Sequence, residues 1–169
     1  MTIIVENGSI VPNANSYITV SGVDNYCSAM GYDAWTTTSS GIKEQSLLKA
    51  MRYVDGLRWK GIKYTQDQYT SWPRDNVYDI DERLVPYTVI PIKVIEAVCE
   101  ACVLSLPTSE FNLEPTITKD DYKTSEAVAS VVSNTYVVTD DTIRSKSTII
   151  ESKLRGLLKN KIIITIERA

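Results

Sequence analysis

The stretch PIKVIEAVCEACVLSLP, residues 91–107, is the most apolar long segment of the chain and decides the fold. Its apolar side chains recur every three or four residues, which is typical of a helix with one face in a core. Proline stands at its first turn and again just past its end, and proline is compatible with a helix start but not with its continuation. Charged residues interrupt the segment, and it is too short to span a bilayer. We therefore predict a central, buried helix.

Patterns on both sides of this segment predict further helices. One begins at Ser21, which serves as its cap, and stops at Gly31. A second runs from about residue 42 to residue 58, with an apolar stripe at helical spacing. A third opens at Thr148, with a glutamate three residues later that forms a capping box. The expected fold class is mainly α: a small bundle of about four helices with a β-hairpin or extended segment and extended N- and C-terminal arms.

The length of 169 residues suits one domain with its own core. We expect an N-terminal arm at 1–20, a helical core at 21–107, an extended or hairpin region at 108–146, and a C-terminal helix with a tail strand at 147–169. Valines are frequent in residues 127–139, and a Ser-Asn pair among them is typical of a turn. The hairpin is therefore expected there.

Composition excludes several classes of function. The chain has 18 basic and 21 acidic residues, a net charge of −3 and a pI of about 5.1. Domains that hold phosphate backbones usually have a pI above roughly 9, so tight non-specific DNA binding is disfavoured, although a local basic patch is compatible with this balance. Histidine is absent, which removes Ser-His-Asp and Cys-His catalysis. We expect a soluble protein without a signal peptide, enzyme activity, cofactor or metal.

Two clusters that resemble chemical sites have simpler explanations. Cys99 and Cys102 have the spacing of a redox pair, but they fall in the middle of the predicted apolar helix rather than at an N-terminus that lowers a thiol pKa. Cys27 is the one other cysteine, too few for a zinc site, and we expect three buried thiols in a reducing compartment. The acids of DNVYDIDER, residues 75–83, lack the glycine of a calcium loop and indicate a solvated acidic loop.

The stretch RWKGIKYTQDQYTSWPRDNVYD, residues 58–79, mixes aromatic and basic side chains. One explanation is a platform for single-stranded nucleic acid, with rings stacked on bases and cations on phosphates. The other is a long loop that its aromatics fix to the helical core. The interleaved aspartates favour the second explanation. The predicted anchors are Trp59, Trp72, Pro73 and Arg74, and the predicted DNA or partner contacts in this stretch are Arg58, Lys60 and Lys63.

The C-terminal region carries a second basic cluster and an apolar tail. Lys153, Arg155 and Lys159 are predicted either to decorate a solvated helix or to contact DNA or a partner protein. The chain ends in KIIITIERA, whose isoleucines are unfavourable in water as an isolated strand. We expect them to add to a sheet, in this subunit or in a neighbour's. The predicted tail interface comprises Ile162, Ile164, Ile166 and Arg168.

Several motifs together resemble one family of small tailed-phage proteins. The motifs are IIVENGSIVPNANSYITV (3–20), DNYCSAMGYDAW (24–35), AMRYVDGLRWKG (50–61), TSWPRDNVYD (70–79) and IPIKVIEAVCEACV (90–103). Members of this family carry the label of DnaT-like single-stranded-DNA-binding proteins. In assembled phages, proteins of this kind resemble head-tail connector (adaptor) subunits. The resemblance covers almost the whole chain and is weakest over residues 108–140.

The resemblance to connectors implies a structural virion protein at the head-tail junction, made in the host cytoplasm. It implies a homo-oligomeric ring, commonly of twelve copies, that binds the portal protein above and a tail or head-completion protein below. Genomic double-stranded DNA would pass through the ring with weak contacts only, and no membrane is involved. The alternative is a single-stranded-DNA-binding accessory protein of phage replication, whose affinity would fall steeply as salt rises.

Overall fold

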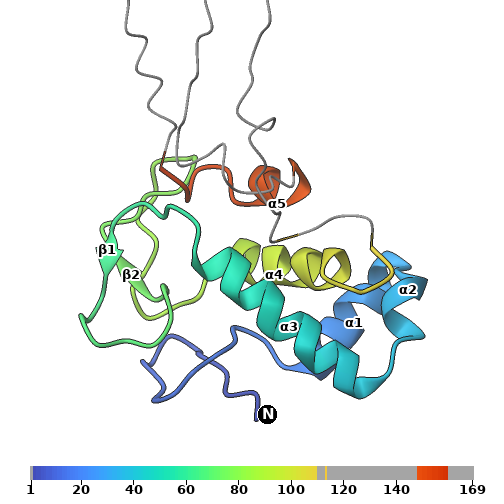
Figure 1. Cartoon of the computed structure of the whole chain (residues 1–169). Coiled ribbons are helices and arrows are strands. Elements are labelled where there is room, and N and C mark those ends of the chain that lie inside the picture. The colour runs from blue at the N-terminus through green and yellow to red at the C-terminus, as the bar shows by residue number, and fades with distance from the viewer. Residues whose placement is uncertain (1, 110–112, 114–147, 160–169) are drawn as a thin grey trace, which may run out of the picture.

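The computed structural model describes residues 2–109, 113 and 148–159 (Figure 1). This part of the chain is mainly α-helical with one two-stranded antiparallel sheet, which confirms the predicted fold class. In chain order the elements are α1 (Val20–Met30), α2 (Asp33–Thr36), α3 (Ser40–Asp55), β1 (Ile62–Lys63), β2 (Arg74–Asp75), α4 (Ile92–Leu104) and α5 (Thr148–Lys153). The hairpin expected at 127–139 and the tail from residue 160 lie outside the described residues. No helix of the described part is long and apolar enough to cross a bilayer.

Helix α4 is the centre of the fold. It packs against α1, α3 and α5, and in Figure 1 α3 runs alongside it while α5 lies above. Val94, Ala97, Val98 and Cys102 have no exposed area. Complete burial of one Val-sized side chain stabilises a fold by about 1.5–3 kcal/mol. The prediction of a central, buried helix is confirmed, and Pro91 is its cap residue rather than part of its first turn.

Helix α1 begins one residue before the predicted Ser21. The reason is that Thr19 is the cap, and its Oγ1 accepts the backbone N–H of Gly22 at 3.0 Å. The helix stops at Gly31, as predicted. Gly31 has a φ of 73°, in the left-handed region that glycine adopts without strain, and its N–H donates to a carbonyl of the last turn.

The structure differs from the prediction at two further places after α1. Helix α3 ends at Asp55 rather than near residue 58, because Gly56, which has a low helix propensity, follows it. The single turn of α2 was not predicted. It is held by tertiary contacts, since Trp35 is fully buried and its Nε1 donates to Asp24 of α1 at 2.8 Å. A helix this short has too few residues to show a periodic pattern and is not stable alone.

The N-terminal segment is a closed loop rather than the expected extended arm. The Glu6 side chain is buried, and its carboxylate accepts the backbone N–H groups of Gly8 at 2.8 Å, Ile10 at 3.0 Å and Val11 at 2.8 Å. Charge-assisted bonds of this kind satisfy backbone donors that a folded loop would otherwise leave unpaired. The conformation of this segment is therefore fixed by hydrogen bonds between its own residues, chiefly those that the Glu6 carboxylate accepts.

The long loop predicted after α3 contains two short β-pairings. β1 and β2 pair antiparallel, with Ile62 opposite Asp75 and Lys63 opposite Arg74. Further along the chain, residues 77–85 form a hairpin around an isolated bridge. These pairings satisfy backbone groups in a connection that is unusually long for a compact domain.

The three cysteines are buried free thiols, as predicted. Burial raises the pKa of both Cys27 and Cys99 to about 12, and it raises the pKa of Cys102 well above its usual value. Neutral buried thiols behave as small apolar side chains. Within the described residues, no group of three or more His, Cys, Asp or Glu side chains is placed to hold a metal ion.

Candidate nucleic-acid interface

The two tryptophans of the 58–79 stretch lie in the core. Trp72 has no exposed area and Trp59 is 3% exposed. Their rings meet edge to face, with centroids 5.5 Å apart and planes at 85°, an arrangement that aromatic pairs favour. The Trp59 Nε1 donates to the carbonyl of Asp55 at 3.3 Å. Neither ring is accessible to a nucleic-acid base, so any base-stacking surface here must use other rings.

Arg74 fixes the same loop from the inside. Its Nε donates to the carbonyl of Lys60 at 2.7 Å, Nη1 to that of Ser71 at 3.0 Å and Nη2 to that of Gly61 at 3.0 Å. Burial lowers its pKa, and the planar guanidinium suits several fixed acceptors at once. The neighbouring Pro73 is also buried. The guanidinium therefore holds the two sides of the loop together and is not directed at a phosphate.

A polar network that the sequence did not reveal ties the loop to α3. The Tyr17 hydroxyl donates to Asp55 Oδ1 and accepts the backbone N–H of Trp72 at 3.0 Å. The same Asp55 oxygen accepts the backbone N–H of Ser71 at 2.7 Å. Burial, and then the charge of Asp55, raise the pKa of Tyr17 well above its usual value. No sequence motif indicates this network, because its members come from three separate segments.

Basic side chains gather where the chain after α5 returns to the loop after α3. Trp59 and Leu158 form an antiparallel bridge, flanked by backbone hydrogen bonds of 2.9 and 2.8 Å. In this register the residue before Trp59 faces the residue after Leu158. Arg58 therefore lies directly opposite Lys159, and Lys60 follows two residues along the same strand.

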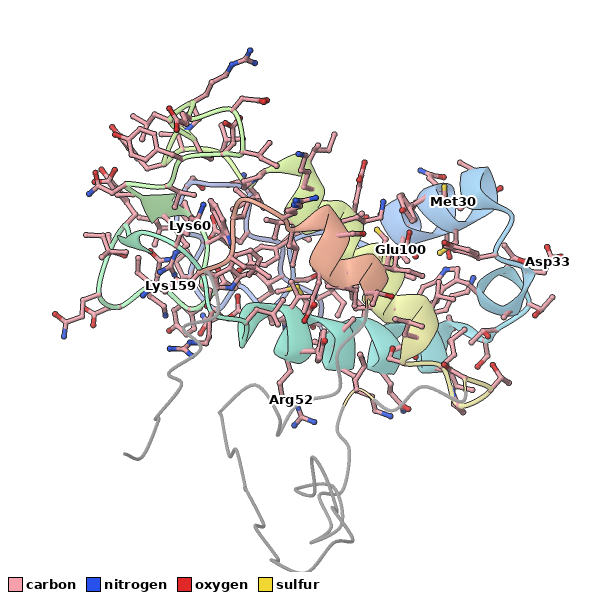
Figure 2. The ribbon with its side chains drawn as sticks, turned by 90° about the horizontal axis from the view of Figure 1, so that it is seen from above. Met30, Asp33, Arg52, Lys60, Glu100 and Lys159 are labelled. Carbon is pink, nitrogen blue, oxygen red and sulfur yellow. The ribbon has the colours of Figure 1, made fainter. Side chains whose placement is uncertain are left out.

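The alternation of side chains puts these three cations on one face, which also carries the buried Leu157 opposite Lys60. Residues i and i+2 of a strand share a face, and Trp59 occupies the other, inner face. Arg58 and Lys159 are exposed, and Lys60 is half-buried. Figure 2 shows Lys60 and Lys159 at one end of the molecule and Met30 at the opposite end. We call Arg58, Lys60 and Lys159 the basic seam.

The basic seam favours a negatively charged ligand. Like charges directly opposite each other on antiparallel strands are destabilising, by roughly 0.2–1 kcal/mol. Among the described residues, no carboxylate lies within salt-bridge distance of a seam cation. A bound anion between Arg58 and Lys159 would relieve this repulsion, and a phosphate is an anion that both side chains recognise well.

The other predicted basic contacts lie outside the seam. Lys63 and Arg155 are exposed, and the Lys63 ammonium donates to the carbonyl of Gln68 at 3.3 Å. Lys153 turns towards α4, with its Nζ 3.2 Å from the carboxylate of Glu96. Burial alone would lower the pKa of Lys153, but its contacts, first with Tyr26 and then with Glu96, outweigh burial and raise the pKa.

Lys153 belongs to a polar cluster that joins α5 to α1 and α4. Glu100 is 4% exposed and accepts the hydroxyls of Tyr26 at 2.7 Å and Tyr32 at 2.9 Å. The Lys153 ammonium lies 3.7 Å from Glu100 and 5.6 Å from the centre of the Tyr26 ring. Burial, and then the hydrogen bond to Glu100, raise the pKa of Tyr26 to about 12. Lys153 therefore contributes to docking α5 rather than to the seam.

Exposed aromatic rings lie in the loop that continues from Lys60. Tyr64 is 44% exposed and Tyr69 is 61% exposed. Tyr64 stacks on Tyr87 with centroids 4.3 Å apart and planes at 7°. Exposed aromatic rings can stack on bases of any sequence. Proteins that bind single strands usually combine such rings with a basic groove that holds the phosphates. The sequence predicted Trp59 and Trp72 as anchors, and the structure shows in addition that Tyr64 and Tyr69 of this stretch are exposed.

Comparison with known proteins gives one finding. A family model described as "Putative DnaT-like ssDNA binding protein" matches residues 1–169, the whole chain. No curated protein and no solved structure shows a significant match. The match agrees with the family label expected from the sequence motifs, and nothing in it supports the connector identity. This chain belongs to the DnaT-like single-stranded-DNA-binding protein family.

Proposed function

We propose that this protein binds single-stranded DNA, with the basic seam on the phosphates. The observation that carries the proposal is the pairing of residues 58–60 with 157–159, which sets Arg58 opposite Lys159, with no carboxylate of the described residues within salt-bridge distance of either. The family description supports the same ligand. Because the whole chain is acidic, binding depends on this local patch and is reversible and sensitive to salt. The protein acts by binding and not by catalysis.

In this proposal the exposed tyrosines give the protein its preference for single-stranded DNA. A duplex hides the faces of its bases, whereas a single strand offers them to a ring such as Tyr64 or Tyr69. Stacking of one base on an aromatic ring contributes about 1–3 kcal/mol. The seam alone would bind any polyphosphate, so the tyrosines supply the discrimination between single-stranded and double-stranded DNA.

Charge reversal in the seam tests the proposal. The double variant Lys60→Glu, Lys159→Glu is expected to bind labelled oligothymidine at least about ten-fold more weakly at low salt, because it replaces attraction to phosphate by repulsion. For wild type, three phosphate contacts predict a slope of about −2 in a plot of log affinity against log salt concentration. The slope should approach zero in the variant. Fluorescence anisotropy across a salt series measures both quantities.

Lys49 provides the matched control, because it is exposed on α3 and lies outside the seam. Lys49→Glu makes the same charge change at one site and should leave the slope unchanged. Equal affinities and slopes for wild type and the seam variant would contradict the proposal. So would weak binding by wild type at every salt concentration.

A second candidate function, a head-tail connector subunit, is favoured by a different observation. The segment from β1 to the start of α4 exposes most of the large apolar side chains at the surface of the described part. They are Ile62, Tyr64, Tyr69, Tyr78, Ile80, Leu84, Tyr87, Val89 and Ile92. Concentration of exposed apolar side chains in one region is typical of a protein–protein interface. In this proposal the segment meets a neighbouring subunit of a ring or the portal, and DNA passes with weak contacts.

The number of copies per virion separates the two candidates. Quantitative mass spectrometry of purified, DNA-filled phage particles should find about one copy per portal subunit if the chain is a connector, because matched rings share a symmetry axis. Absence from the particle, together with presence in infected-cell lysate, would exclude the connector and leave DNA binding in the cell. The salt series gives a second test: an affinity for oligothymidine that falls with salt supports DNA binding, and weak binding at every salt concentration supports the connector.

A further inference from the structure

The hairpin at residues 77–85 carries an apolar ridge. Tyr78 and Leu84 face each other across it, and backbone hydrogen bonds of 2.8 and 3.0 Å flank this pair. Such a pair is of the narrow type, in which the two side chains stand close together on one face. Tyr78 is 51% exposed, Leu84 56% and the intervening Ile80 54%. We call Tyr78, Ile80 and Leu84 the hairpin ridge.

The same hairpin has an unpaired strand edge. In a narrow pair, the N–H and C=O of each residue point away from the partner strand. Within the part of the chain that the structure describes, the N–H and C=O of Leu84 have no hydrogen-bond partner. The side chains of Asp81, Glu82 and Arg83 are exposed beside this edge, and the two acids outnumber the arginine. An exposed edge with apolar side chains recruits another strand, and the acids favour a strand that carries basic residues.

The C-terminal segment of this chain has the complementary composition. Residues 160–169 read NKIIITIERA, with Ile162, Ile164 and Ile166 at alternate positions, Ile163 between them, Lys161 before them, and Glu167 and Arg168 after them. β-Branched residues at a period of two are the strongest pattern for a strand with one apolar face. Its isoleucines match the hairpin ridge, and Lys161 at one end of the segment is complementary to the acids at the hairpin tip.

The course of the chain favours a segment from another molecule. Gly156 lies against the hairpin, since a Cβ there would be 2.9 Å from the backbone nitrogen of Ile80. From Gly156 the chain runs to Lys159, which pairs with Arg58. The antiparallel pairing directs the described chain towards the end of α3 at Lys159, away from Gly156 and its contact with the hairpin.

We propose that the hairpin ridge of one molecule binds the C-terminal segment, residues 160–169, of a second copy of this chain. The segment adds a strand to the Leu84 edge, lays its isoleucines on the ridge and brings Lys161, at one end of the strand, to Asp81 and Glu82. The contact is heterologous, because ridge and tail are different surfaces. It does not require DNA binding, and it would give the connector candidate one of its intersubunit contacts.

Sedimentation velocity of the full chain over a range of concentrations tests the inference. Wild type is expected to associate as concentration rises, whereas Leu84→Asp and Ile164→Asp should each remain monomeric. Met30→Asp is the control, because Met30 is 50% exposed, close to the 56% of Leu84, but lies at the other end of the molecule (Figure 2). Far-UV circular dichroism verifies that each variant is folded. A monomeric wild type, or association undiminished in both ridge and tail variants, would overturn the inference.

Mixing the two variants tests the heterologous geometry. Leu84→Asp keeps an intact tail and Ile164→Asp keeps an intact ridge, so an equimolar mixture is expected to form dimers although neither variant associates alone. A mixture that stays monomeric would show that ridge and tail do not meet between molecules and would overturn the inference. Neither position belongs to the basic seam. Oligothymidine affinity measured on the same samples therefore distinguishes failure of this inference from failure of the proposed DNA binding.

Discussion

Replacing Trp72 with alanine is expected to lower the free energy of unfolding by about 3–5 kcal/mol. The side chain is fully buried and meets Trp59 edge to face, so truncation leaves a cavity in the core and removes an aromatic contact. Domains of this size are stable by only about 5–15 kcal/mol, so the variant should be close to unfolding at room temperature. Urea denaturation followed by far-UV circular dichroism measures the loss.

Two variants make this result specific. The Trp72 Nε1 has no hydrogen-bond partner in the described part of the structure, so Trp72→Phe removes no hydrogen bond and should cost clearly less than the alanine variant. Tyr69, in the same loop, is 61% exposed. Tyr69→Ala should change stability by less than about 0.5 kcal/mol. If Trp72→Ala were as stable as Tyr69→Ala, the tryptophan would not anchor the loop.

Replacing Glu100 with alanine is expected to cost a similar amount, about 3–5 kcal/mol, because it removes one partner of a buried charged cluster. The hydroxyls of Tyr26 and Tyr32 lose their acceptor, and the Lys153 ammonium loses one of its two nearby carboxylates. Urea denaturation measures the stability. Hydrogen exchange of the α5 amides should also quicken, because Glu100 joins α4 to Lys153.

Glu96 provides the matched control for this prediction. It lies one turn earlier in α4 and contacts the same Lys153, but its side chain is 37% exposed. Exposed ion pairs contribute at most about 1 kcal/mol, so Glu96→Ala should be nearly neutral. Equal losses in the two variants would mean that α5 is held by its apolar side chains, such as the buried Ile150, rather than by the buried carboxylate.

The sequence predicted the central helix, and the reason is physical. α4 is flanked by prolines and buries apolar side chains at helical spacing, so local preference and tertiary packing agree. Gly31 was predictable in the same way, since a helix stop with positive φ is a local property. The buried state of Trp72 was also expected from its flanking proline and the interleaved acids. In each case residues close together in the chain carry the information.

The seam and the closed N-terminal loop depend on contacts that no local pattern contains. Arg58 and Lys159 are opposite each other only because two distant segments share a register. Glu6 looks like a solvated acid in the sequence, and only the fold turns three backbone donors towards it. Lys153 and Lys159 are both basic residues near α5, but one faces Glu96 and the other faces solvent. The amino-acid sequence alone does not distinguish the surroundings of these two lysines.

The bridge between Trp59 and Leu158 also sets an order of events during synthesis. Helices α1 to α4 are complete once Leu104 has left the ribosome, but the strand that covers Trp59 arrives only with residues 157–159. At a synthesis rate of about 5–20 residues per second, Trp59 stays uncovered for several seconds. A nascent chain in that interval offers an apolar surface to chaperones. It also lacks the basic seam, because Arg58 and Lys159 come opposite each other only after residue 159 has emerged.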